Sequence, residues 1–228
     1  MSAALFNLLH LSDPNLPIGG YAHSAGLETF VQQQIVNDAA TAENFVREML
    51  ADNIRYTDAA FVSLAFDAFM NGDYQIILQL DAECQAVKLP EEMRQASVKM
   101  GNRLLKIFSP VCPQELVEIY REQLLQQKTY GHYPVVFGIC AAAMNINKTD
   151  MLSGFFYNAA VGFVTNCVKL IPLGQQQGQQ LLHSIQPLLK ELVKASVYPD
   201  KEKIGVCCAG FDIAQMQHEQ LYTRLYMS

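Results

Sequence analysis

Apolar residues recur every three or four positions along most of this chain of 228 residues. That spacing places them on one face of an α-helix. A half-buried strand would instead alternate apolar and polar residues, and no convincing alternation of this kind occurs in the sequence. The sequence also lacks repeats at solenoid periods, and no polar linker divides it. It therefore predicts an all-α fold, a single-domain bundle of about nine helices that spans residues 1–228.

Local signals set the ends of the predicted helices. Thr41 and Thr149 are expected caps. Pro90 suits a first helical turn, with Glu91 and Glu92 well placed for the helix dipole. Gly162 would allow a neighbouring helix to approach closely. The Val-Val-Phe run that opens the apolar segment 135–145 also fits a strand. The predicted helices cover residues 2–11, 23–36, 41–71, 73–88, 90–109, 114–127, 135–145, 149–170 and 176–197, with a last one from residue 211.

The last stretch, residues 211–228, has the pattern of an amphipathic helix followed by an ordered terminal segment. Ile213, Met216, Leu221 and Leu225 fall near one helical face. Two interpretations stay open. Most amphipathic helices pack this face onto their own core. The tyrosine, methionine and arginine side chains near the terminus are, however, also the types that bind protein surfaces well.

A second unusual stretch, DPNLPIGGYAHSAGLE at residues 13–28, is dense in proline and glycine yet carries several large apolar side chains. A solvated linker would be more polar, so we expect a shaped and partly buried loop. Its glycines do not form a phosphate-binding loop, because the sequence has no GxxxxGK[ST] motif there and no lysine follows.

Composition excludes several classes of protein. Charged residues make up only 17% of the chain, the net charge is −6, and there is no basic run, so we expect no nucleic-acid partner. The N-terminus lacks the basic segment of a signal peptide, and no uninterrupted apolar stretch of about 18 residues predicts a membrane span. The six cysteines form no CxxC pair, which is typical of free thiols, and we expect a cytoplasmic protein.

Catalytic and metal-binding patterns are also absent from the sequence. No two of the five histidines share an i, i+4 spacing, and no nucleophile with its base can be recognised. The sequence therefore predicts no enzyme, no cofactor and no metal site. One alternative is a soft-metal site formed by Cys207 and Cys208 with His218 close in space.

Four blocks that span residues 12–228 carry a more specific signal. They read SDPNLPIGGYAHSAGLE, GHYPVVFG, NCVKLIPLGQQQGQ and DIAQMQHEQLYTRLYMS. In the same order they resemble the blocks SPxLPVGxFxxSxGLE, GHxPVxFG, AVRLVPLGQxxGQ and DxASMxHExLYxRLFxS of the urease accessory protein UreF family. A weaker block, SVKMGNRLL, resembles SRxxGxxLL. One such block would be weak, but four in order are highly specific.

The resemblance implies an all-α homodimer without chemistry of its own. UreF-like proteins assemble with the accessory protein UreD, called UreH in some species, and with the GTPase UreG. That assembly delivers nickel to apo-urease, whose active-site lysine must be carbamylated. Two alternatives stay open, namely a regulator that activates the UreG GTPase and a protein that binds nickel directly.

The resemblance also implies which residues bind partners. Arg224 falls on a family arginine that holds the terminal segment for UreD/UreH binding, and a helix C-cap is its alternative role. In the loop, Tyr21, Ser24 and Glu28 are expected to be exposed. The partner-binding candidates are Pro14, Pro17, Gly19, Gly20, Tyr21, Ser24, Gly26, Glu28, His218, Glu219, Tyr222, Arg224, Leu225 and Tyr226.

The sequence departs from the family pattern at three charged positions. Lys99 and Lys169 stand where the family often has arginine, and a lysine cannot copy the bidentate guanidinium fork. Neither residue therefore fits an arginine finger for the GTPase, and Arg103 is the remaining candidate. Met227 replaces a frequently basic residue, which removes one charge from the terminal contact.

Overall fold

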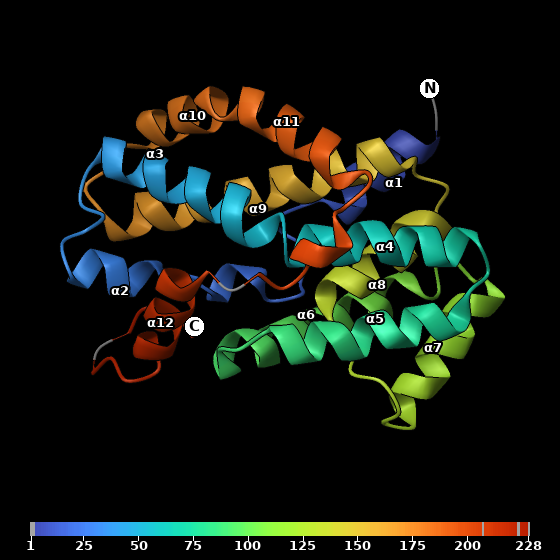
Figure 1. The fold of residues 1–228 in the computed structure, drawn as a ribbon. Helices are drawn as coiled ribbons and strands as arrows, with labels where there is room; N and C mark the ends of the chain where they lie inside the picture. The colour runs from blue at the N-terminus through green and yellow to red at the C-terminus, as the bar shows by residue number, and fades with distance from the viewer. Residues whose placement is uncertain (1–2, 207, 223, 228) are drawn as a thin grey trace.

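The structure is a computed structural model that describes residues 3–206, 208–222 and 224–227 (Figure 1). Twelve α-helices and no strand occur in these residues, so the predicted all-α class is confirmed and the predicted number of about nine helices was wrong. The α-helices are α1 (Ala3–Leu11), α2 (Leu27–Gln32), α3 (Ala39–Glu48), α4 (Asp58–Met70), α5 (Tyr74–Val87), α6 (Glu91–Phe108), α7 (Glu115–Leu125), α8 (Tyr133–Ala143), α9 (Lys148–Leu170), α10 (Gln175–Ser184), α11 (Gln186–Ser196) and α12 (Ala209–His218). Three short segments complete the helical structure: η1 (Gly20–Ala22), the π-helical η2 (Met49–Ile54) and η3 (Lys201–Lys203).

Two of the predicted helices are each divided in the structure. The 41–71 pattern becomes α3 and α4, with the wider turns of η2 between them. The 176–197 pattern becomes α10 and α11, because Pro187 lies in the first turn of α11 and has no backbone N–H to donate to a preceding turn. The apolar spacing continues across both breaks, so the spacing alone did not reveal them.

Two predicted caps lie just inside their helices. The Asp38 side chain caps α3 by accepting from the Thr41 N–H at 2.8 Å, and the Thr41 hydroxyl accepts from the Asp38 N–H at 3.0 Å. Thr41 is therefore the second half of a capping box. Asn147 caps α9 by accepting from the Asp150 N–H at 2.9 Å, which leaves Thr149 in the first turn.

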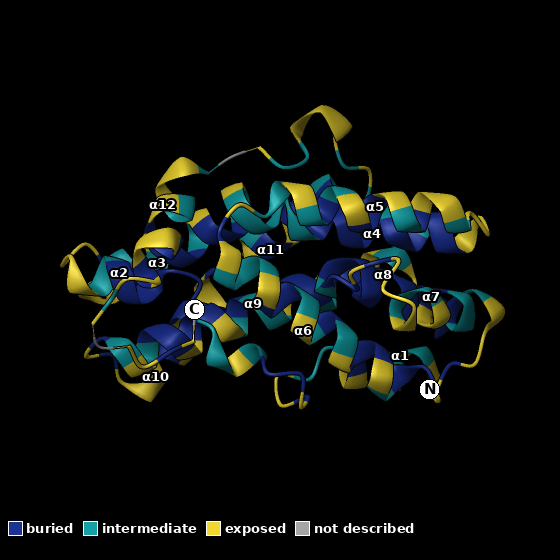
Figure 2. Cartoon of the chain, turned by 90° about the horizontal axis from the view of Figure 1, so that it is seen from below, coloured by how far each residue is buried: buried dark blue, intermediate teal, exposed yellow. Residues whose placement is uncertain are grey.

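The centre of the molecule is α8, in which residues 134–143 are all buried, and the strand alternative for this segment was wrong. α8 packs against α4 and α6. Its contact with α4 is close because a Cβ on Gly138 would lie only 2.5 Å from the Val62 carbonyl oxygen. Gly162, by contrast, faces open space, so its expected role in helix packing was wrong. In Figure 2 the buried residues lie on the inward faces of the helices and the exposed ones on the outward faces and loops.

The turn before α8 is built around the buried Asp81 of α5. The Asp81 carboxylate accepts hydrogen bonds from the backbone N–H groups of Tyr130 at 2.6 Å, Gly131 at 2.9 Å and His132 at 2.8 Å, and from the Thr129 hydroxyl at 2.5 Å. Hydrogen bonds to a buried, charged carboxylate are strong, and these four give both of its oxygens partners. Asp81 therefore fixes where α8 enters the core.

α9 is long and apolar enough to cross a membrane, by length and composition, whereas the sequence predicted no span. Half of its most apolar window is buried inside the chain, and it packs against α3, α4, α10 and α11. The core helix of a water-soluble protein meets the same criteria, so α9 alone does not indicate a membrane protein.

Candidate functional site

The C-terminal helix α12 lies beside α2 and packs against α2 and α6, with both apolar and polar residues inward (Figure 1). Its buried residues include Gln215 and His218, whereas Ile213 and Met216 are 53% and 41% exposed. The helix therefore does pack onto its own chain, and the Phe211 ring lies 5.8 Å from that of Phe30, but the side that carries Ile213 and Met216 is not the one that turns inward. The helix also ends before two residues that the sequence assigned to that face, Leu221 and Leu225.

Hydrogen bonds from α2 and from its C-cap residue favour this orientation. The Thr29 hydroxyl donates to the Ala214 carbonyl at 2.8 Å, and the Gln33 amide donates to the Gln217 side chain at 3.1 Å. The Thr29 contact is buried. Turning the helix over would leave buried polar groups without partners, at a cost of about 1–3 kcal/mol each.

Glu28, in the first turn of α2, is the centre of the contacts that hold the chain terminus. Its Oε1 accepts from the Leu225 N–H at 2.6 Å, and its Oε2 accepts from the Tyr226 N–H at 3.2 Å. Oε2 also lies 2.9 Å from Nε2 of His218. The Glu28 side chain is only 7% exposed. Hydrogen bonds to a buried charge are strong, about 1.5–3 kcal/mol each, so Glu28 binds the terminal backbone firmly.

Glu92, in the first turn of α6, holds the same segment from the other side. Its Oε2 lies 3.3 Å from Nδ1 of His218, and its Oε1 accepts from Nη1 of Arg224 at 2.6 Å. The fully buried His218 ring thus lies between two carboxylates. A protonated ring donates from both nitrogens, whereas a neutral ring donates from one. We call Glu28, Glu92, His218 and Arg224 the terminal clamp.

Arg224 makes a contact that the sequence did not predict, an ion pair with Glu92. Its guanidinium binds the Glu92 carboxylate, and α12 ends at His218, so the C-cap alternative for Arg224 was wrong. Glu219 supports the same region from an exposed position, since its side chain accepts from the Glu92 N–H at 3.3 Å.

Tyr226 anchors the segment beyond the clamp. Its side chain is 6% exposed, and the Lys169 ammonium lies 6.0 Å from its ring centroid. Burial, and next the Glu28 charge, raise the pKa of the Tyr226 hydroxyl. The following N–H, of Met227, donates to the Ala22 carbonyl at 2.8 Å. Tyr226 is therefore used by its own chain and is not available as a surface contact.

The side chains that remain exposed near the terminus are mainly large and apolar. Tyr222, Leu225 and Met227 are 102%, 67% and 63% exposed, and they add to Ile213 and Met216 of α12. We call these five residues the terminal apolar surface. Large apolar side chains on a backbone that is already held in place form a ready docking element, because binding need not order that backbone first.

The proline- and glycine-rich loop contains the other candidates. Pro14, Pro17 and Tyr21 are exposed, with Tyr21 at 70%, and Gly20 is half-buried. The expected exposure of two residues was wrong, because Ser24 and Glu28 are buried. Two glycines of the loop adopt positive φ, +92° for Gly19 and +82° for Gly26, a conformation that favours glycine, whereas Gly20 does not.

Arg103 contacts its own chain. Its Nη1 donates to the Ile18 carbonyl at 3.1 Å and packs against Gly19, where a side chain would clash with the guanidinium. The structure thus gives Arg103 a role in shaping the loop, and its suggested role as an arginine finger stays a prediction.

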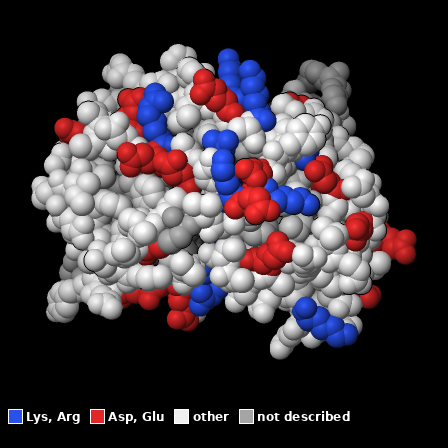
Figure 3. Space-filling model, in the orientation of Figure 1, with Lys and Arg blue, Asp and Glu red and all other residues white. Residues whose placement is uncertain are grey.

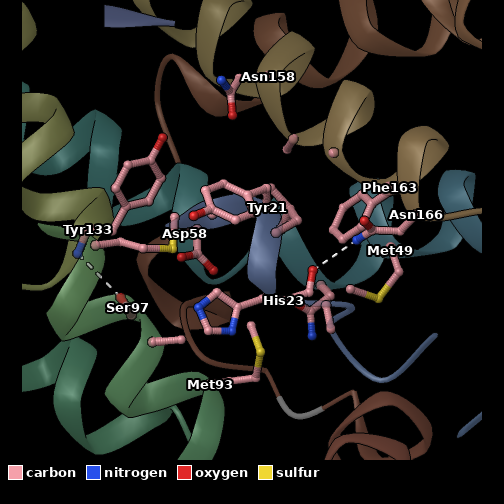
Figure 4. A pocket seen from close by; sticks show the side chains of 18 of the residues that line it. Tyr21, His23, Met49, Asp58, Met93, Ser97, Tyr133, Asn158, Phe163 and Asn166 are labelled. Carbon is pink, nitrogen blue, oxygen red and sulfur yellow. Dashed lines mark hydrogen bonds between the residues drawn. The ribbon is translucent and has the colours of Figure 1, made fainter. Parts of the chain in front are cut away.

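The same loop lines a cavity of about 430 Å³ between α6 and α9 (Figure 4). Pro14, Gly20 and Tyr21 contribute to its wall. Lys88 and Asp58 meet there, with the ammonium 2.9 Å from both carboxylate oxygens. Burial opposes the charged ammonium, but Asp58 outweighs it, so the pKa of Lys88 lies above its ordinary value. The volume is in the range of small-molecule sites, and no sequence pattern predicted it.

His23 also lines this cavity (Figure 4). Burial, and next the Lys99 charge, lower the pKa of the imidazole. Its backbone carbonyl accepts from the Asn166 amide at 2.8 Å. A neutral imidazole in this position adds no positive charge to the wall.

The metal-site alternative requires Cys208 and His218 to meet. Cys208 precedes α12 and its thiol donates to the Asp52 carbonyl at 2.9 Å, whereas His218 ends α12. A helix of this length separates the two by about 15 Å, so they cannot share one ion. The third member, Cys207, lies outside the described residues. Within the described ranges, no group of three or more His, Cys, Asp or Glu side chains is arranged to hold a metal ion.

Figure 3 shows how charge is distributed on one face of the molecule. Lys and Arg side chains stand singly or beside Asp and Glu, and broad areas of this face carry no charge. A mixed surface with large uncharged areas favours a protein partner over the phosphate backbone of a nucleic acid.

Among the clamp residues, the sequence nominated Glu28, His218 and Arg224. In the structure Glu28 contacts His218 directly, and Glu92 links His218 to Arg224. Sequence reasoning missed Glu92, which was assigned only to the dipole of α6. The only sequence feature of Glu92 was its place in the first turn of a helix. That feature does not indicate which residue its side chain contacts.

Comparisons with known proteins all point to the same family. The sequence model of the UreF family matches residues 36–186. The chain is 49% identical over 221 residues to "Urease accessory protein UreF" of Actinobacillus pleuropneumoniae serotype 5b, covering 97% of each sequence. It is 48% identical to the protein of that name from Haemophilus influenzae strain KW20, covering 97% of this chain and 94% of that protein. Over 224 residues it is 32% identical to the one from Bacillus sp. strain TB-90, covering 98% and 99%.

Proposed function

Because this chain belongs to the urease accessory protein UreF family, we propose that it is an assembly protein of urease maturation. In this proposal it binds UreD/UreH and the GTPase UreG, and the complex supports GTP-dependent nickel insertion into apo-urease. The chain itself contributes binding surfaces, and it acts as a homodimer. Its role is that of a scaffold and not of an enzyme.

The observation that carries the proposal is the terminal apolar surface. Its large side chains are exposed, yet the backbone beneath them is bound by Glu28 and Glu92. When a partner covers exposed apolar side chains, their removal from water makes the free energy of binding more favourable. We propose that UreD/UreH covers this surface.

The terminal clamp gives this docking site a further property. A free, flexible terminus would lose conformational entropy on binding, which lowers the affinity. In this structure part of that cost is already met by contacts within the chain, through Glu28, His218 and Arg224. The clamp residues are therefore positioning residues for docking, and the apolar side chains make the contact.

Affinity measurement with purified UreD/UreH tests the proposal at single residues. Leu225→Ala removes a side chain that is 67% exposed, so the variant should fold normally. We expect about tenfold weaker binding, since truncating a central apolar contact typically costs more than 1 kcal/mol. Leu125→Ala is the matched control, because this leucine is 70% exposed at the end of α7.

Co-purification with UreD/UreH and UreG extends the test to the complex. A chain truncated before Gln220 should stay folded and lose UreD/UreH. Equal binding by the full chain, the truncated chain and Leu225→Ala would reject docking through this surface. The partner interface would then have to be sought at Pro14, Pro17 and Tyr21. Light scattering of the free full-length chain tests the proposed homodimer.

A further inference from the structure

The cavity of about 430 Å³ between α6 and α9 has the composition of a small-molecule site, in which a mainly apolar wall carries a few polar groups. Three methionines line it, Met49, Met93 and Met100, together with the rings of Phe155 and Phe163. Figure 4 shows Met93 on one side of this space and Met49 with Phe163 on another. A ligand in the cavity would therefore be surrounded by apolar side chains from several elements.

Two departures from regular backbone geometry lie in the cavity wall. The segment η2 is π-helical, and its residues Met49, Asn53 and Ile54 line the cavity. Ala25 lines it as well and has φ +54°, a left-handed conformation that is unfavourable for a residue with a Cβ. Single π-helical turns and strained residues are both frequent at functional sites. These two features indicate a binding site independently of the cavity volume.

The main polar feature of the cavity is the ion pair of Lys88 and Asp58. Their side chains are only 11% and 14% exposed, and Nζ of Lys88 lies 2.9 Å from each Asp58 oxygen. Oδ2 of Asp58 also accepts from the Thr57 hydroxyl at 2.9 Å. An ammonium has three N–H donors and a carboxylate oxygen has two lone pairs. The ion pair can therefore still offer a ligand one N–H donor, from Lys88, and one acceptor position, on Oδ1 of Asp58.

This pair of groups favours a neutral polar group over a charged one. A carboxamide has an acceptor oxygen and an NH₂ donor side by side, which matches the donor and the acceptor of the pair. A carboxylate would meet the charge of Asp58, and an ammonium would meet that of Lys88, in a site where little water screens the repulsion. The other charged residues of the wall, Asp13, Lys169 and Asp212, are half-buried or exposed, so water screens them more.

The methionines favour an aromatic body on the same ligand. A methionine side chain is flexible and adapts to the shape of what it contacts, and its sulfur makes favourable contacts with aromatic rings. Met49, Met93 and Met100 come from η2 and α6, so they can contact a ring from more than one direction.

We propose that this cavity is a binding site for a small neutral ligand that carries a carboxamide on an aromatic ring. The carboxamide binds to Lys88 and Asp58, and the ring lies among Met49, Met93 and Met100. The proposal does not rest on the proposed function, because none of these residues belongs to the terminal clamp or to the terminal apolar surface.

Methyl NMR of the full-length chain tests the site with benzamide as the probe. The methyl groups of the nine methionines are labelled with ¹³C, and their signals are assigned with single methionine-to-leucine variants. We expect saturable shift changes at Met49, Met93 and Met100, and nuclear Overhauser effects between these methyl groups and the benzamide ring. Met70 is the internal control, since it is 61% exposed at the end of α4 and should show neither effect.

Three related probes test the polar group on the wild-type chain. Benzoate carries a negative charge, benzylammonium a positive charge, and toluene no polar group. Each loses a hydrogen bond to the ion pair or faces a like charge, so we expect roughly tenfold or more weaker binding than for benzamide. Binding of any of the three as tightly as benzamide would overturn the proposal. So would the absence of saturable changes with benzamide, or contacts with Met70 in place of the three cavity methyl groups.

Discussion

Replacing Glu28 with glutamine tests the terminal clamp with little change in side-chain shape. In the wild-type chain both carboxylate oxygens accept, Oε1 from the Leu225 N–H and Oε2 from the Tyr226 N–H, and Oε2 also faces His218. Glutamine has one acceptor oxygen and one NH₂ donor. Whichever way the amide is turned, its NH₂ group faces a backbone N–H of the terminal segment.

The size of the effect follows from that mismatch. One N–H group, of Leu225 or of Tyr226, loses its acceptor in a site where Glu28 is only 7% exposed. An unpaired buried donor costs about 1–3 kcal/mol. The cost applies to the closed state of the terminal segment, so its open population should rise by roughly 5- to 150-fold.

Amide hydrogen exchange of the free protein measures this population, because these amides exchange when the segment opens. We expect the Leu225 and Tyr226 amides of Glu28→Gln to exchange faster by that factor, and UreD/UreH binding to weaken with them. Glu118→Gln is the control, since Glu118 is 42% exposed in a surface ion pair with Arg121. Unchanged exchange at both amides in Glu28→Gln would refute the clamp.

Two further predictions concern the core. Gly138→Ala places a Cβ 2.5 Å from the Val62 carbonyl oxygen and should lower the free energy of unfolding by about 1–3 kcal/mol, whereas Gly162→Ala faces open space and should be neutral or stabilising. Urea unfolding compares the two, and equal effects would contradict the packing argument. Burial lowers the pKa of His132 from 6.5 to about 4. The unfolded chain therefore binds a proton that the native state excludes, and stability that is full above pH 6.5 should fall by up to roughly 3 kcal/mol as the pH drops towards 4. Urea midpoints at about pH 7.5 and pH 5 measure this loss, and the same pH dependence in His132→Gln would count against it.

The all-α class and the positions of most helices could be predicted from the sequence. Helix formation depends on residues three or four positions apart and on caps and prolines next to them. The apolar segment that became α8 was correctly placed in the core because it is apolar on every side. The four motif blocks likewise identified the family, since they depend only on residue order.

The candidate site was predicted only in part. The resemblance nominated Glu28, His218 and Arg224 as partner contacts, but Glu28 and His218 are buried and bind the chain's own terminus. Glu92 was missed altogether. Glu28 and His218 are 190 positions apart, and His218 and Glu92 are 126 apart, so no local pattern links them.

The sequence alone thus determined that helices form and which family they belong to, because both depend on neighbouring residues. Only the tertiary structure decided which side of α12 turns inward. The periodicity of α12 favoured burial of Ile213 and Met216, yet the buried side carries His218. The physical reason is that Glu28 of α2 and Glu92 of α6 offer hydrogen-bond partners that His218 reaches only when α12 packs against both helices. The apolar side chains were left exposed as a consequence, and they form the surface to which we assign docking.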